Sequence, residues 1–336
     1  AAIIMPNSSS LERTTSVLEK IENNIKDVPG VQTSNAISGF SLIDGGFKTS
    51  AGTFFMTLKP FSDRYKNSET ARKESSEAIV AELARIGMTS QLDGLVVPLN
   101  PPAIPGLGNT GGFEFWISDT AGGSAKQLQE VLDKYLQEAK KRPELTGLTS
   151  TYSASNQQLK INYDRDKAQL LGLTSADVFD TLQAQFGSAI VSQFSQYSRV
   201  WFVIVQSAPE FRVKPDDVGK LYVRNASGDM IPLSSVITTE YTNGPTLLPH
   251  YNGFPAAQII GNTAPGYSSG QGMAAMEEVA DQVLPMGYKY GWTGISYEQQ
   301  SAGSSSAIVF GFGLLLVFLV LAAQYESWAL PGSVIL

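Results

Sequence analysis

The chain has 336 residues, no cysteine and a single histidine, His250, and its formal net charge at pH 7 is −7. A length beyond about 250–300 residues favours more than one hydrophobic core, so two or more domains are expected. Lysine and arginine form no basic cluster, which argues against a nucleic-acid-binding surface. Without cysteine there is no disulfide framework, and one histidine leaves no zinc-hydrolase or Ser-His-Asp motif.

The first third of the sequence alternates strand-like and helix-like segments. Strands are expected over 1–5, 31–37, 53–59 and 92–99, and helices over about 10–26 and 68–86. The first helix should begin with a capping box formed by Ser9 and Glu12, and it carries Leu18, Ile21 and Ile25 on one face. This βαββαβ order predicts a ferredoxin-like subdomain, in which two helices cover one side of a four-stranded antiparallel sheet.

A stretch of fifteen residues separates the expected second and third strands and is longer than a plain hairpin turn requires. This stretch, 38–52, combines glycines with bulky apolar side chains, among them Gly45, Gly46, Gly52, Phe40, Leu42, Ile43 and Phe47. The composition predicts a glycine-hinged, moving loop that contacts apolar surfaces. On the next strand only one of Phe54 and Phe55 can face the core, so the other must face a different surface.

A second unit of the same kind follows a breaker-rich stretch and is interrupted. Its first half is expected to contain a strand over 113–118, a helix capped by Ser124 and a strand near 148–152. Its second half is expected to contain a strand over 256–261, a helix capped by Ser268 and a strand over 288–292. The β-rich residues between the halves, about 155–253, contain a helix capped by Thr174. They are expected to form a separate lobe.

The last part of the sequence contains no charged residue between Glu298 and Glu326. Residues 301–324 therefore predict a membrane-spanning helix, because about 20 apolar residues cross the hydrocarbon layer. The alternative is a buried helix of a soluble domain. Both ends of the sequence fall inside expected elements, so a larger membrane protein is expected.

Five short motifs carry a family resemblance. They are PPAIPGLGNTGGFEF (101–115), DKAQLLGLT (166–174), HYNGFP (250–255), YGWTGISYEQQ (290–300) and LAAQYESWALP (321–331). Together they resemble the second periplasmic half of resistance-nodulation-division (RND) multidrug efflux transporters of the AcrB/MexB kind, over essentially the whole chain. The resemblance implies porter subdomain PC1 over 1–110, porter subdomain PC2 over 111–154 and 254–297, docking subdomain DC over 155–253, transmembrane helix 8 over 301–324, and a membrane-interface loop with the start of the next helix over 325–336.

The resemblance also implies site residues. The distal drug pocket would be lined by Asn35, Ile37, Phe40, Leu42 and Phe55, and the proximal pocket by Val97, Leu99, Pro101 and Phe254. The switch loop between them would comprise Phe40, Ser41, Leu42, Ile43, Asp44, Gly45, Gly46 and Phe47. The docking hairpin would comprise Arg224, Asn225, Ala226, Ser227, Gly228 and Asp229. The chain departs from the family pattern at Asn35, Leu42, Val97 and Leu99, which replace phenylalanines, and this leaves the substrate spectrum open.

The implied function is proton-driven multidrug efflux across the bacterial inner membrane, with residues 1 to about 300 in the periplasm. Such a protein is a drug/proton antiporter and not an enzyme, and it needs no metal and no cofactor besides the proton motive force. Residues 307–323 contain no Asp or Lys, so the proton relay would lie outside this segment. Implied partners are two further copies in a homotrimer, a periplasmic membrane-fusion adaptor, an outer-membrane channel, the lipid bilayer and hydrophobic or amphiphilic drugs, without nucleic acid.

Three alternatives stay open from the residues alone. The chain could be a periplasmic assembly scaffold that binds no cargo, or an acylphosphatase-type enzyme, since that class shares the βαββαβ order. The enzyme would need a phosphate-cradling loop after the first strand, where PNSSS (6–10) offers neither glycine nor arginine. A metal-ion exporter of the RND class is the third alternative, although no methionine pair occupies the expected pocket positions.

Overall fold

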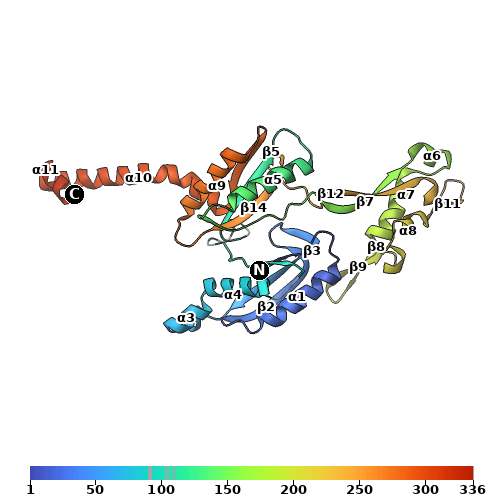
Figure 1. Cartoon of the computed structure of the whole chain (residues 1–336), viewed down its shortest axis with the longest axis horizontal. Helices are drawn as coiled ribbons and strands as arrows, with labels where there is room; N and C mark the ends of the chain where they lie inside the picture. The colour runs from blue at the N-terminus through green and yellow to red at the C-terminus, as the bar shows by residue number, and fades with distance from the viewer. Residues whose placement is uncertain (90–92, 103, 105, 109, 336) are drawn as a thin grey trace. The chain divides into compact units, whose positions relative to one another are not determined.

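The computed structural model describes residues 1–89, 93–102, 104, 106–108 and 110–335, with side chains for all of these except 303–308, 334 and 335. The chain divides into two compact units (Figure 1). One unit comprises Ala1–Ser155 together with Pro245–Leu336, and the other comprises Asn156–Gly244.

The N-terminal part of the first unit is a four-stranded antiparallel sheet with strand order β2-β3-β1-β4. Its strands are β1 (Ala2–Ile4), β2 (Val31–Ser41), β3 (Gly46–Leu58) and β4 (Leu95–Val97), and its helices are α1 (Leu11–Ile25), α2 (Phe61–Arg64), α3 (Ser68–Glu74) and α4 (Ser76–Thr89). Helices α1 and α4 pack on this sheet (Figure 1) and bury a core that includes Ile3, Ile21, Phe54 and Leu83. The sequence therefore predicted the order of the strands along the chain and the buried helix faces correctly, but not the short helix α2.

Three local expectations in this part need correction. The N-cap of α1 is Ser10, whose Oγ accepts a hydrogen bond from the Arg13 backbone N–H at 3.3 Å, whereas the Ser9 hydroxyl donates to the Pro6 carbonyl. The helix expected over 68–86 is split into α3 and α4, because Ser75 adopts an extended conformation. The strand expected over 92–99 is shorter and comprises only β4, and its expected first residue lies outside the described residues.

The stretch 38–52 is not a long loop. Strand β2 continues through Phe40 and Ser41, which pair with Phe47 and Gly46 at the start of β3. Only the four residues between the strands, 42–45, form the turn. The expected loop is therefore an irregular hairpin, because ladder hydrogen bonds satisfy backbone groups that a free loop would leave to water.

The second sheet of the first unit is antiparallel and follows the order β13-β14-β5-β15, with β6 also paired to β14. Its strands are β5 (Phe113–Asp119), β6 (Leu145–Thr149), β13 (His250–Tyr251), β14 (Phe254–Thr263) and β15 (Tyr288–Thr293), and its helices are α5 (Ala125–Ala139) and α9 (Ser269–Val283). The capping boxes expected at Ser124 and Ser268 are confirmed. The strand expected near 148–152 begins three residues earlier, at Leu145.

The core of this second sheet is aromatic. Phe115 on β5 stacks on Tyr135 of α5 with ring centroids 5.4 Å apart, and the Tyr135 hydroxyl donates to the Met276 carbonyl of α9 at 2.8 Å. Apart from β13, the strands of this sheet follow the order β6-β14-β5-β15. Numbered among themselves along the chain, these four strands are the second, third, first and fourth, which is also the order of the strands in the first sheet. The first unit thus contains the same antiparallel arrangement twice.

The second unit contains three two-stranded antiparallel sheets and short helices. The pairs are β7 (Asn156–Tyr163) with β12 (Ile237–Gly244), β8 (Ala189–Gln196) with β9 (Arg199–Val205), and β10 (Tyr222–Arg224) with β11 (Met230–Pro232); the helices are α6 (Arg165–Leu170), α7 (Ser175–Leu182) and α8 (Asp216–Gly219), with helical turns at Gln183–Gly187, Pro209–Phe211 and Leu233–Ser235. Thr174 caps α7 through a capping box, as expected. Val178 and Leu182 on α7 pack into this unit's own core.

The C-terminal segment forms α10 (Gly294–Tyr325) and α11 (Ala329–Ile335), drawn in red in Figure 1. The helix expected over 301–324 is present within α10. Within the described part of the chain, no helix combines the length and the apolarity of a membrane-crossing segment. Part of the expected range, 303–308, has side chains outside the described residues.

Candidate functional site

The tip of the β2–β3 hairpin folds back and is fastened to β3 by one hydroxyl. Thr53 Oγ1 donates a hydrogen bond to the Phe40 carbonyl at 2.8 Å and accepts one from the Leu42 backbone N–H at 3.2 Å. Thr53 is fully buried. A buried hydroxyl with both a donor and an acceptor partner holds the backbone more firmly than a solvated one, so the tip has a defined position.

The tip also reaches the second sheet of the same unit. Ile43 is 3% exposed and packs in a small apolar cluster with Ala2 of β1 and Ile260 of β14. Asp44 accepts hydrogen bonds from the Ser41 hydroxyl and from the Thr151 hydroxyl. The hairpin tip thus bridges the two sheets through one apolar anchor and one carboxylate.

A first cavity, of about 260 Å³, opens beside this hairpin. Its lining includes Leu42 and Phe55 from the expected distal pocket, and Leu99 and Pro101 from the expected proximal pocket. The expectation that Phe54 and Phe55 face opposite ways is confirmed, because Phe54 is 1% exposed in the core and Phe55 is 43% exposed. Both rings border the cavity, Phe54 from the core side and Phe55 from the exposed side of β3.

A second, larger cavity of about 560 Å³ lies between the two sheets of the first unit. Strand β4 and the residues after it contribute Val97 and Leu99, and the second sheet contributes Leu148 and Ile260. Lys140, at the end of α5, is the one charged side chain in this lining. Val80 and Leu99 border both cavities, so two aliphatic side chains stand between them.

Other expected pocket residues lie elsewhere. Asn35 pairs with Phe55 across the strands, and both Asn35 and Ile37 are exposed on β2 without lining either cavity. Phe40 meets Phe47 edge to face, with ring centroids 5.9 Å apart. Phe254, at the start of β14, also lies outside both linings.

The expected docking hairpin is a tight turn in the second unit, between β10 and β11. Asn225 organises it, because its Oδ1 accepts hydrogen bonds from the backbone N–H groups of Ser227 at 3.0 Å and Asp229 at 2.8 Å. Gly228 has a φ of +95°, which favours glycine at this position. Arg224 ends β10 and Ala226 donates its backbone N–H to the Gly172 carbonyl.

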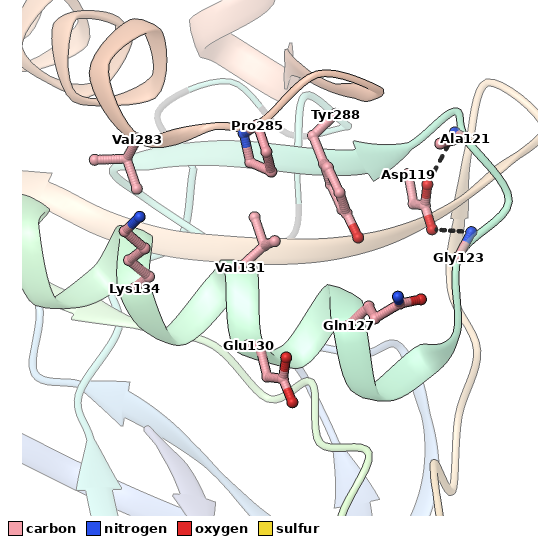
Figure 2. A pocket seen from close by; sticks show the side chains of 10 residues that line it. All are labelled: Asp119, Ala121, Gly123, Gln127, Glu130, Val131, Lys134, Val283, Pro285 and Tyr288. Atoms are coloured by element: carbon pink, nitrogen blue, oxygen red, sulfur yellow. Dashed lines mark hydrogen bonds between the residues drawn. The ribbon is translucent and has the colours of Figure 1, made fainter.

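A further pocket, which the sequence did not indicate, lies between α5 and β15 and has a volume of about 410 Å³. Figure 2 shows Val283, Pro285 and Tyr288 on one side and the α5 side chains, including Glu130, on the other. The buried Asp119 carboxylate accepts three backbone N–H groups, those of residues 121–123. Burial raises the pKa of the Tyr288 hydroxyl, and the Asp119 and Glu130 carboxylates raise it further.

The cavities around Leu99 are better suited to binding a ligand than to catalysing a reaction. Their linings are mostly aliphatic and aromatic, with Lys140 as the charged exception. Within the part of the chain that the structure describes, no group of three or more His, Asp or Glu side chains could hold a metal ion. Apolar cavities with few polar groups take up hydrophobic molecules of varied shape, because aromatic and aliphatic contacts impose little directionality.

Comparison with known proteins gives a consistent result. The model of the AcrB/AcrD/AcrF family matches residues 1–336. A multidrug/solvent efflux pump membrane transporter, MepB of Pseudomonas putida, is 36% identical over 338 residues, which cover 100% of this chain and 31% of that protein. The multidrug export protein AcrF of Escherichia coli K12 is 36% identical over 337 residues, covering 99% of this chain and 32% of AcrF.

A third relative, the multidrug resistance protein MdtF of Escherichia coli K12, is 33% identical over 335 residues, which cover 99% of this chain and 31% of MdtF. The chain thus spans just under a third of the length of these relatives.

Proposed function

The chain belongs to the AcrB/AcrD/AcrF family, and from this premise we propose that it is the drug-binding part of a multidrug efflux transporter. The observation that carries the proposal is the pair of apolar cavities that meet at Leu99, beside an anchored hairpin tip. Hydrophobic and amphiphilic molecules would occupy these cavities. The names of the relatives, which describe multidrug and solvent efflux, support the same substrate class.

We assign the two halves of the first unit to porter subdomains of ferredoxin-like type, PC1 over 1–110 and PC2 over 111–154 and 254–297. The repeated strand order of the two sheets supports this assignment. We assign 155–253 to a docking subdomain, and the compactness of Asn156–Gly244 as a unit supports it. The porter and docking residues, 1 to about 300, would lie in the periplasm of a bacterium and belong to an inner-membrane pump.

The hairpin tip is the element that would move during transport. Its apolar anchor is the Ile43 cluster, and its polar anchors are Thr53 and Thr151. Because these contacts are few, the tip can give them up for others when a bound molecule favours a second arrangement of the tip. Movement of the tip beside Leu42 and Leu99 would then change the volume offered to the substrate.

The energy source and the partners of the transporter are also proposed from the family. The proton motive force would drive drug/proton antiport through residues outside this segment. The working assembly would be a homotrimer with a membrane-fusion adaptor and an outer-membrane channel. The turn formed by Arg224–Asp229 is the part of the docking subdomain that we assign to these contacts.

Replacing Phe40 and Phe55 together by alanine in the full-length transporter tests this function. We expect higher intracellular accumulation of hydrophobic dyes, because an aromatic ring is removed from the cavity lining and another from the hairpin that supports it. Phe211→Ala, which truncates an exposed ring in the second unit, is the control. Accumulation unchanged by the double substitution for every dye tested would contradict the proposal.

A further inference from the structure

One buried hydroxyl in the first unit has no hydrogen-bond partner. Thr110 is 5% exposed, and its Oγ1 is the buried side-chain polar atom that lacks a partner among the described residues. Leaving a buried hydroxyl unpaired destabilises a protein, so such a group calls for a specific explanation.

Thr110 lines a cavity of about 530 Å³ that adjoins the larger cavity between the sheets, because Gly111 and Asn262 border both. The first turns of two helices meet there: Ser269 comes from α9, and Ser296 and Gln299 come from α10. Gln299 Nε2 donates to the Ser269 hydroxyl at 2.7 Å, so the two helices are joined across the cavity. Ser296 is 3% exposed and supplies a second buried hydroxyl.

The polar groups of this lining are all neutral. They are the hydroxyls and amides of Thr110, Asn262, Thr263, Ser269, Ser296 and Gln299, and the lining contains no Asp, Glu, Lys or Arg. The N-terminal ends of α9 and α10 carry partial positive charge, which disfavours a cation. An anion is disfavoured as well, because the lining offers no cationic side chain to pair with it.

We propose that this cavity, the Thr110 cavity, binds a neutral ligand that carries hydrogen-bond acceptor oxygens, such as the sugar headgroup of an alkyl glycoside. Rotation of Thr110 about χ1 directs its hydroxyl to a ligand oxygen, and the Ser296 hydroxyl binds a second one. Phe113, Met273 and Ile295 contact the apolar part of the ligand. The Thr110 cavity is thus a further binding site besides the cavities at Leu99. This inference rests on the proposed function and adds to it a class of substrate that is neutral and rich in oxygen.

An ordered water is the competing explanation, since water also satisfies buried polar groups in roomy polar cavities. The two explanations predict opposite effects of removing the hydroxyl. Thr110→Val keeps the shape of the side chain and removes the hydroxyl. If the proposal holds, the substitution raises the unfolding temperature of the ligand-free protein, because a buried unpaired hydroxyl is lost. With an ordered water on Thr110, the same substitution removes a satisfied hydrogen bond and lowers that temperature.

The test uses the full-length transporter in lipid nanodiscs and three probes with the same octyl chain: octyl β-D-glucoside, octyltrimethylammonium and octyl sulfate. Binding is measured by calorimetry below the micelle concentration, with empty nanodiscs as the background. We expect the glucoside to bind to the wild type more tightly than either charged probe. Thr110→Val should weaken glucoside binding about tenfold, the loss expected for one hydrogen bond, and Thr110→Ser, which keeps the hydroxyl, should retain it.

Two outcomes would overturn the proposal: equal binding of the glucoside by wild type and Thr110→Val, or equal binding of the three probes. Ser296→Ala provides the second variant if Thr110→Val does not fold, with the same expected weakening and the same contrary result. Leu99→Ala separates this site from the proposed transport function, because it should impair efflux of hydrophobic dyes while the tenfold difference in glucoside binding between threonine and valine at position 110 persists in the Leu99→Ala background.

Discussion

Two apolar side chains at the β2–β3 hairpin have opposite environments. Ile43 is 3% exposed in the cluster with Ala2 and Ile260, whereas Phe47 is 92% exposed. Ile43→Ala should lower the free energy of unfolding by about 2–4 kcal/mol, because a cavity is left in a packed cluster. Phe47→Ala, the control, should change it by about 1 kcal/mol or less, because this exposed ring loses only its edge-to-face contact with Phe40. Urea unfolding of the chain measures both, and equal effects would contradict the anchoring role of Ile43.

Asp217 makes the second unit sensitive to acid. Its carboxylate accepts a hydrogen bond from Lys220 Nζ at 2.7 Å and from the Lys214 backbone N–H at 2.9 Å. These bonds, led by that from Lys220, hold the pKa of Asp217 below its ordinary value. A lowered folded-state pKa gives stability that is present above the unfolded-state pKa, about 3.9, and is lost as the pH falls through the folded-state value.

We therefore expect Asp217→Asn to lower the unfolding temperature of the chain at about pH 7, and we expect this deficit to shrink towards about pH 2, because the wild-type carboxyl takes up its proton as the pH falls. Thermal unfolding of wild type and variant at both pH values measures the difference. A deficit of the variant that is as large in acid as at neutral pH would show that Asp217 acts through its shape and not through its charge.

At the scale of the element, the Thr151 hydroxyl fastens the hairpin tip, through Asp44, to the segment that follows β6. Thr151→Val removes this donor, and we expect amide hydrogen exchange in the turn 42–45 to become about tenfold faster, because a hydrogen bond to a carboxylate no longer opposes opening. Thr57→Val, an exposed position on β3, is the control. Exchange that is unchanged by Thr151→Val would remove the fastening role.

The elements show which parts of the fold a sequence can predict. Helix starts at Ser124, Thr174 and Ser268 were predictable, since a capping box is a local pattern of side chain and backbone. The hairpin over 38–52 was not, because its pairing is irregular and its glycines resemble those of a free loop. Its stability comes from Thr53 and from residues more than a hundred positions away, such as Thr151 and Ile260.

At the scale of the whole molecule, the cavities depend on the meeting of distant segments. Leu99 and Phe55 were expected near a pocket from the family resemblance, and the structure places both in one lining. Lys140 and the Thr110 cavity were not expected, because nothing local in the sequence brings the end of α5 or the start of α10 to a cavity. Periodicity predicts which face of an element is buried, but not which cavity two faces enclose.

The central claim is that hydrophobic substrates occupy the cavities at Leu99, and the chain's lack of cysteine allows a direct test. Single cysteines are introduced by Leu99→Cys and, as the control, by Met286→Cys at a fully exposed position, in a full-length transporter otherwise free of cysteine. The rate of maleimide labelling is measured with and without a hydrophobic dye. We predict that the dye slows labelling at position 99 and leaves position 286 unchanged; equal labelling rates at position 99 with and without dye would contradict the account.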